Sequence, residues 1–158
     1  MFFKDIPEAK GTLDFVGLNY YTHVLVGPAS VSLLKMKFPK RRQEVATEFG
    51  YPMYAEGLRR AIEFLAPLNV PIEITENGVA DAEDTLRTEH LRRHLWVLSN
   101  AVKDGHDVRS YHHWSLMDNF EWAEGYSMRF GLHRVDFESQ ERTLRPSGEV
   151  YKAIVGRR

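Results

Sequence analysis

The chain contains no cysteine among its 158 residues, which excludes a disulfide scaffold, a zinc site built on thiolates and a thiol nucleophile. It also lacks an uninterrupted apolar run of the roughly 18 residues that a membrane span needs. Residues 1–5, Met-Phe-Phe-Lys-Asp, do not have the charged start and apolar core of a signal peptide. From these absences we expect a cytoplasmic protein with no membrane as its partner.

The sequence has no excess of either charge, because 21 Lys and Arg residues face 22 Asp and Glu residues. This balance excludes a protein-wide basic surface, so nucleic acid is not an expected partner. The basic run from Lys35 to Arg42 is a local exception. A solvated loop explains this run better than a phosphate site does, since no glycine-rich cradle accompanies it.

The hydrophobic pattern predicts three strands that alternate with three helices. The expected strands are residues 13–21, 70–75 and 108–116. The expected helices are residues 53–68, residues 84–103 and a last helix that begins at Pro146. Long loops are expected at residues 23–50 and 117–145, the latter with a short hairpin around 131–137. This order is typical of βαβ units, so we expect one α/β domain over residues 1–158 with a parallel sheet.

The longest predicted helix, residues 84–103, has apolar residues at helical spacing. Its expected buried stripe consists of Leu91, Leu95, Leu98 and Val102. A stripe of this kind would pack against the sheet.

Polar and aromatic side chains follow the predicted strands at the points where they end. Asn19 and Tyr21 close the first strand, Glu76 follows the second, and Trp114 lies in the last part of the third. Ligand sites of parallel α/β folds lie beyond the carboxyl ends of the strands. We therefore expect these side chains to share one site.

Glu76 is the candidate catalytic group at this end of the sheet. Strand alternation would place Ile72, Ile74 and Glu76 on one face, so that the carboxylate continues an apolar row into a barrel interior. Burial beside tyrosine hydroxyls would tune such a carboxylate for catalysis. The alternative from the residues alone is a carboxylate that caps a helix or closes a turn.

Two tryptophans bracket two carboxylates in the segment after the third predicted strand. Trp114 and Trp122 stand on either side of Asp118 and Glu121. Sugars present apolar C–H faces and hydroxyl rims, so a sugar site needs aromatic plates with hydrogen-bond acceptors beside them. The pattern favours a carbohydrate, although tryptophans of a core are the alternative.

A metal centre is not expected. His112 and His113 are adjacent, so on a strand they face opposite sides, and no set of Asp, His and Glu has a known metal-ligand spacing. The sequence therefore predicts no metal and no cofactor.

Three motifs in a fixed order carry a resemblance to a known family. They are Asp14 to Thr22, Ile-Thr-Glu-Asn-Gly at residues 74–78, and Trp114 to Tyr126. Shorter matches follow at residues 129–132, 135–136 and 145–147, and the likeness runs from about Pro7 to Ile154. With these motifs the chain resembles glycoside hydrolase family 1, the family of β-glucosidases and β-galactosidases.

The resemblance implies a retaining mechanism on a (β/α)8 barrel. The glutamate of the family's Thr-Glu-Asn-Gly motif is the nucleophile, which falls on Glu76, and the tyrosine that hydrogen-bonds it falls on Tyr21. The resemblance also assigns substrate-binding positions. These are Asn19, Trp114 as the stacking plate, Glu121 as the acceptor of two hydroxyls, Trp122 beside it and Phe130.

The resemblance also implies that the chain covers only part of such an enzyme. A (β/α)8 barrel takes roughly 250 residues, and the family's acid/base glutamate lies in an Asn-Glu-Pro motif that this sequence lacks. We therefore expect the C-terminal part of a TIM barrel, strands six to eight with their helices, inactive on its own. The expected partners are a β-glycoside or oligosaccharide substrate and a missing N-terminal barrel segment. The alternatives are a carbohydrate-binding fragment without turnover and one half of a split enzyme.

Overall fold

The computed structural model describes residues 7–9, 11–24 and 45–156. The basic run from Lys35 to Arg42 and most of the expected loop at 23–50 lie outside these residues. Within the described part of the chain, no helix is both long and apolar enough to cross a bilayer.

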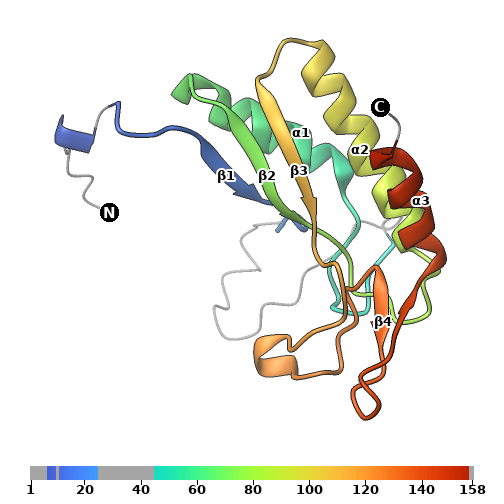
Figure 1. The fold of residues 1–158 in the computed structure, drawn as a ribbon. Helices are drawn as coiled ribbons and strands as arrows, with labels where there is room; N and C mark the ends of the chain where they lie inside the picture. The colour runs from blue at the N-terminus through green and yellow to red at the C-terminus, as the bar shows by residue number, and fades with distance from the viewer. Residues whose placement is uncertain (1–6, 10, 25–44, 157–158) are drawn as a thin grey trace, which may run out of the picture.

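A parallel sheet of three strands forms the centre of the fold (Figure 1). Its strands are β1 (Val16–Asn19), β2 (Ile72–Asn77) and β3 (Val108–His113), and β2 pairs with both neighbours. The predicted parallel arrangement is confirmed. Because each outer strand is paired on one side only among the described strands, β1 and β3 leave backbone groups for further pairing.

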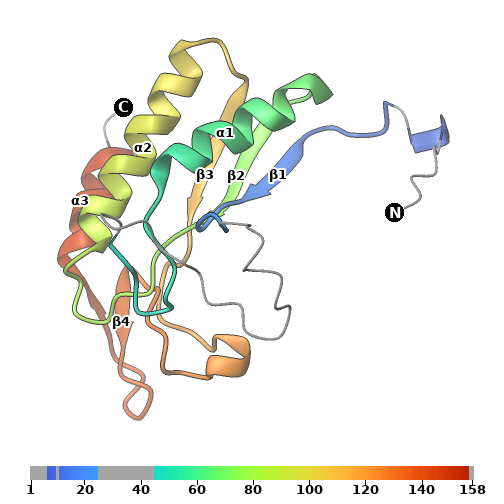
Figure 2. The ribbon, with the colours of Figure 1, turned by 180° about the vertical axis from the view of Figure 1, so that it is seen from behind.

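The helices lie together on one face of this sheet (Figures 1 and 2). They are α1 (Ala55–Leu65), α2 (Arg87–Lys103) and α3 (Pro146–Val155), each placed after one strand of the parallel sheet. The core lies between sheet and helices, and Ile72 and Ile74 pack there against Leu58, Ile62 and Val97. The predicted alternation of strands and helices is therefore confirmed.

The predicted bounds differ from the observed ones where side chains interrupt regular structure. The helix expected to Leu68 ends at Leu65 and continues as a 3-10 turn (Ala66–Leu68), because Pro67 cannot donate a helical hydrogen bond. The helix expected from Asp84 begins at Arg87 instead. Asp84 has a φ of 58°, and the carboxylate of Asp81 accepts the N–H of Arg87 at 2.9 Å.

The expected hairpin lies later in the chain than predicted. Strands β4 (His133–Val135) and β5 (Arg142–Leu144) pair antiparallel, and a turn over residues 136–141 connects them. The N–H groups of Glu138 and Ser139 both donate to Asp136 at 2.9 and 3.0 Å, which closes this turn. Local apolar patterning predicted the hairpin but not the position of its two short strands.

The buried face of α2 is rotated from the predicted leucine stripe. Its buried residues are Arg87, His90, Leu91, His94, Val97 and Ala101. Of the predicted stripe only Leu91 is fully buried, and Val102 is 47% exposed. The prediction was correct for Leu91 and for Leu98, which packs against the core, but it omitted the two buried histidines, which move the buried face by part of a turn.

Candidate active site

Glu76 lies at the carboxyl end of β2, where the strand is irregular. The pairing of β2 with β3 shifts register between Ile74 and Asn77, so Asn77 follows the buried row of Ile72 and Ile74. The prediction that Glu76 continues that row is therefore wrong. The row packs against the helices, whereas the irregularity leaves Glu76 lining a pocket beyond the strand ends.

Asn77 fastens the end of β2 to both neighbouring strands. Its amide nitrogen donates to the carbonyl of Tyr20 at 2.7 Å, and its amide oxygen accepts the hydroxyl of Tyr111 at 2.9 Å. The N–H of Tyr20 donates to the carbonyl of Glu76, and the N–H of Trp114 to that of Asn77, each at 2.9 Å. The backbone that carries Glu76 is thus held from both sides.

A pocket of about 240 Å³ opens at these strand ends. It is lined by Tyr21, Phe49, Tyr51, Glu76, Trp114, Glu121, Trp122 and Phe130. The fold therefore brings six of the seven sequence-predicted site residues together. Asn19 is the exception: it pairs in register with Glu76, and its side-chain oxygen accepts the hydroxyl of Thr75 at 2.6 Å.

Sequence reasoning missed two aromatic residues of this pocket, Phe49 and Tyr51. The Phe49 ring lies 4.5 Å from that of Tyr51 and 6.1 Å from that of Phe130. Phe130 in turn meets the ring of Tyr21 edge-on at 6.2 Å. The only signal in the sequence was a pair of aromatics at the end of a long loop, and packing of that loop determines where they lie.

Tyr21 and Glu76 are joined by a direct hydrogen bond within the pocket. The hydroxyl of Tyr21 donates to Oε2 of Glu76 at 2.7 Å. Burial, followed by this bond to Glu76, raises the pKa of Tyr21 above its usual value. The phenol therefore stays protonated and remains a donor to the carboxylate.

Glu121 is a second carboxylate in the same pocket. Burial raises the pKa of Glu121, the hydrogen bond from Trp114 opposes that rise, and the nearby charge of Glu76 adds to it. Two carboxylates in one pocket lined with aromatic rings can accept several hydroxyls of a sugar while a ring stacks on its apolar face.

Asp118 anchors the segment that carries Glu121 and Trp122. Its buried carboxylate receives two bonds from Arg145 at 3.0 and 3.1 Å and the N–H of Gly131 at 2.9 Å. A side chain at Gly131 would have no room, since its Cβ would lie 2.2 Å from the nitrogen of Asp118. Asp118 is therefore a structural residue, and of the two carboxylates between the tryptophans only Glu121 lines the pocket.

Within residues 7–9, 11–24 and 45–156, no group of three or more His, Asp or Glu side chains is placed to hold a metal ion. His112 is exposed on β3, whereas both ring nitrogens of His113 are buried without a hydrogen-bond partner.

Known proteins resemble this chain along nearly its whole length. The β-galactosidase of Saccharolobus solfataricus is 38% identical over 157 residues, which cover 93% of this chain and 32% of that enzyme. The β-glucosidase of Agrobacterium sp. is 39% identical, with 96% of this chain and 36% of that enzyme covered. The crystal structure of a β-glucosidase from Pyrococcus furiosus superposes with a TM-score of 0.84 at 44% identity.

That superposition covers 92% of this chain and 33% of the Pyrococcus chain. The chain thus spans about a third of the length of the curated relatives it matches. The model of glycosyl hydrolase family 1 matches residues 3–158. With a family match of this extent, and with the pocket at the strand ends, the chain belongs to glycosyl hydrolase family 1.

Proposed function

We propose that this chain is the nucleophile-bearing portion of a retaining β-glycosidase that hydrolyses terminal β-linked sugars. The contact between Tyr21 and Glu76, in a pocket shared with Glu121 and Trp114, is the observation that carries the proposal. Enzymes named β-glucosidase and β-galactosidase among the relatives support the substrate class.

In the proposed reaction, Glu76 attacks the anomeric carbon and forms a covalent glycosyl-enzyme intermediate. The hydroxyl of Tyr21 holds Oε2 of Glu76, which leaves Oε1 for the attack. Trp114 stacks on this same terminal sugar, and Glu121 accepts two of its hydroxyls. Trp122 donates beside Glu121, while Phe130 and Asn19 complete the proposed sugar subsite.

The leaving oxygen needs a proton from a second carboxylic acid about 5–5.5 Å from the nucleophile. The sequence lacks the Asn-Glu-Pro motif that carries this acid in the family. Glu121 is proposed to bind hydroxyls instead, since Trp114 donates a hydrogen bond to its carboxylate and holds that group among the aromatic residues of the pocket. The proposed acid/base therefore comes from a segment that supplies the remaining barrel strands.

We place the chain as strands six to eight of the barrel, with β1, β2 and β3 in those positions. The coverage of about a third of each relative and the one-sided pairing of β1 and β3 support this placement. The missing segment would pair with both free edges and close the sheet.

A carbohydrate-binding fragment without turnover is the second candidate function. The pocket residues proposed to hold the sugar, Glu121, Trp114 and Trp122, are all present, whereas the proton donor of the family motif is not. Sugar binding by the isolated chain, with no hydrolysis even after barrel completion, would favour this reading.

The test uses barrel completion together with covalent trapping. The chain is co-expressed with the remaining two thirds of the Pyrococcus furiosus β-glucosidase, and hydrolysis of an aryl β-glycoside is measured for each part and for the pair. A 2-deoxy-2-fluoro glycoside should then label the pair on the peptide that contains Glu76. Labelling should disappear in Glu76→Gln and persist in Glu138→Gln, whose carboxylate lies on the exposed hairpin turn. Full hydrolysis by the chain alone, or labelling elsewhere, would overturn the proposal.

A further inference from the structure

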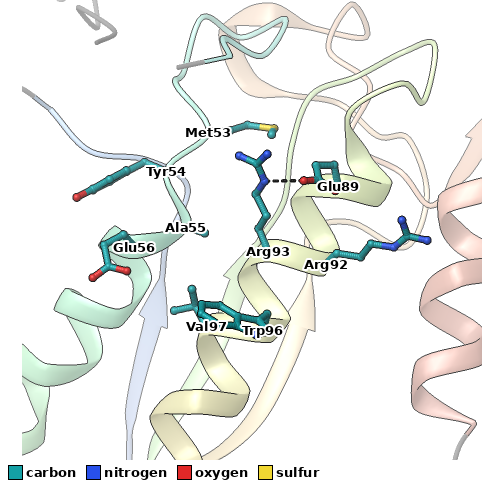
Figure 3. Close-up of a pocket in the computed structure, with 9 residues that line it drawn as sticks. All are labelled: Met53, Tyr54, Ala55, Glu56, Glu89, Arg92, Arg93, Trp96 and Val97. Atoms are coloured by element: carbon teal, nitrogen blue, oxygen red, sulfur yellow. Dashed lines mark hydrogen bonds and ion pairs between the residues drawn. The ribbon is translucent and has the colours of Figure 1, made fainter. Parts of the chain in front are cut away.

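A second hollow, of about 510 Å³, lies between α1 and α2 (Figure 3). Its lining comes from the start of α1 and from the first two-thirds of α2. The residues are Met53, Tyr54, Ala55, Glu56, Glu89, Arg92, Arg93, Trp96 and Val97. None of these residues lines the candidate active site, so the hollow is a separate feature of the surface.

Trp96 is the most exposed large aromatic residue of this hollow. Its side chain is 67% exposed, although an indole offers one of the largest apolar surfaces that a residue can bury. One turn before it, Arg93 donates to Glu89 at 2.7 Å (Figure 3). The hollow thus places an open aromatic face next to a guanidinium and a carboxylate.

The hollow continues into a second one, of about 460 Å³, that shares Glu56, Trp96 and Val97 with it. Together they form one surface groove, here named the α1–α2 groove, with Trp96 in its middle. From Glu89 to Lys103 the groove follows α2 for about 21 Å at roughly 1.5 Å per residue. Arg59 fixes the far end by ion pairs with Glu63 and Asp104, both at 2.6 Å.

The charges that line the groove cancel. Four are acidic and four are basic: Glu56, Glu63, Glu89, Asp104, Arg59, Arg92, Arg93 and Lys103. A polyanion such as a nucleic acid, or an anionic membrane surface, needs a basic excess that is missing here. An aliphatic ligand would leave many of these charged groups without water or a partner.

A neutral ligand with many hydroxyls satisfies both features of the groove. Its hydroxyls can donate to carboxylates and accept from guanidinium groups, and its apolar ring faces can stack on an indole. The candidate active site uses the same combination, with Trp114 and Trp122 beside Glu121. The exposed ion pair of Arg93 and Glu89 contributes little stability by itself, so its partners can turn to a ligand at small cost.

We propose that the α1–α2 groove binds a neutral β-linked oligosaccharide at a site separate from the candidate active site. Trp96 is the stacking plate at its centre, and Glu89, Arg93 and the Arg59 cluster contact hydroxyls on either side. The length of the groove suits a chain of sugars rather than a single ring. The proposal does not depend on whether Glu76 is a nucleophile.

The three tryptophans of the chain, Trp96, Trp114 and Trp122, make the test specific. In a ¹⁵N-labelled protein each indole N–H gives one signal, and Trp96→Phe identifies that of the groove. Titration with cellotetraose should move the Trp96 signal saturably. Trp96→Ala, in which binding is followed by the backbone N–H signal of Val97, should weaken binding at the groove by at least about fivefold, since an aromatic contact is lost.

Matched variants separate the two sites. Glu121→Ala should abolish shifts at Trp114 and Trp122 while the Trp96 signal still titrates. Phe64→Ala, which removes another exposed aromatic of α1 outside the groove lining, should change neither titration. The same titration on the completed barrel repeats the measurement in a closed sheet.

Three results would overturn the proposal. The Trp96 signal could stay fixed up to saturating cellotetraose, or it could move equally in response to a DNA oligonucleotide. It could also shift with protein concentration alone, together with a doubled mass in sedimentation that Trp96→Ala reverses. That last result would make the groove an interface between copies of this chain.

Discussion

The hydroxyl of Tyr21 donates to Oε2 of Glu76 at 2.7 Å and so joins the ends of β1 and β2 across 55 positions of sequence. Both groups lie on elements that the sheet fixes, because the backbone at Glu76 is bonded to both neighbouring strands. The orientation of the proposed nucleophile is therefore set by the fold before any substrate arrives.

Tyr21→Phe removes this hydrogen bond and keeps the ring that packs on Phe130. We expect kcat/KM of the completed barrel to fall about 10- to 100-fold, as a bond to a charged acceptor contributes about 1.5–3 kcal/mol. Steady-state hydrolysis of an aryl β-glycoside measures the change. Tyr126→Phe is the control, because Tyr126 is 53% exposed outside the pocket lining. An equal loss in both variants would contradict a role for the hydroxyl.

Glu76→Ala should lower kcat of the completed barrel by about 10⁴-fold, because the covalent step disappears. Azide or formate can occupy the vacated space and attack the sugar directly. We expect partial recovery of turnover with inversion at the anomeric carbon, read by NMR of the product. Unchanged activity in Glu76→Ala would refute the assignment.

Glu121→Ala should reduce both affinity and kcat. Bonds from sugar hydroxyls to this carboxylate strengthen as the ring distorts, so their loss weakens the transition state more than the ground state. The measurement is kcat and KM for a pair of substrates that share the sugar and differ in the leaving group. A change in leaving-group preference alone would place Glu121 outside the sugar subsite.

The buried histidines of α2 and β3 should make the fold sensitive to acid. Burial lowers the pKa of His94 to about 4 and that of His113 to about 3, and the pKa of His90 also falls well below its usual value. The rings of His90 and His94 stack at 3.8 Å. The buried guanidinium of Arg87 adds a like charge that opposes protonation of His90 and His113.

Since the unfolded chain takes up these protons below about pH 6.5 and the folded chain does not, stability falls as the pH drops through that range. Between pH 7.5 and pH 5 we expect His94 alone to cost about 2 kcal/mol of unfolding free energy. Urea unfolding at the two pH values measures the loss. His94→Leu should reduce the dependence by the share of His94 and leave the shares of His90 and His113 in place. His112→Gln, on the exposed side of β3, should leave the dependence unchanged. A flat profile for the unaltered chain would contradict the prediction.

The order of strands and helices was predictable because each element has a local signature in the sequence. Short apolar runs mark the strands, and Pro146 marks the start of α3. The clustering of Tyr21, Glu76 and Trp114 followed from one rule, that parallel strands end at the same edge of a sheet.

The features that sequence reasoning missed depend on contacts between distant segments. The irregularity at the end of β2 appears only when its pairing with β3 is known. The sequence therefore predicted the wrong face of the strand for Glu76. The bonds of Asn77 to Tyr20 and Tyr111 join three strands. His90 and His94 are buried because α2 packs against α1, α3 and β3, and hydrophobic periodicity carries no such information.

The ion pair between Asp118 and Arg145 means that the two carboxylates of the candidate site, Glu76 and Glu121, are held by different parts of the fold. Glu76 rests on the sheet, whereas Glu121 and Trp122 belong to a loop tied to Arg145, the residue just before α3. Under the proposed function, substitutions within that loop would reshape which sugars are accepted while Glu76 keeps its position. Substrate choice would then change, in a lineage or by design, without rebuilding the proposed chemistry.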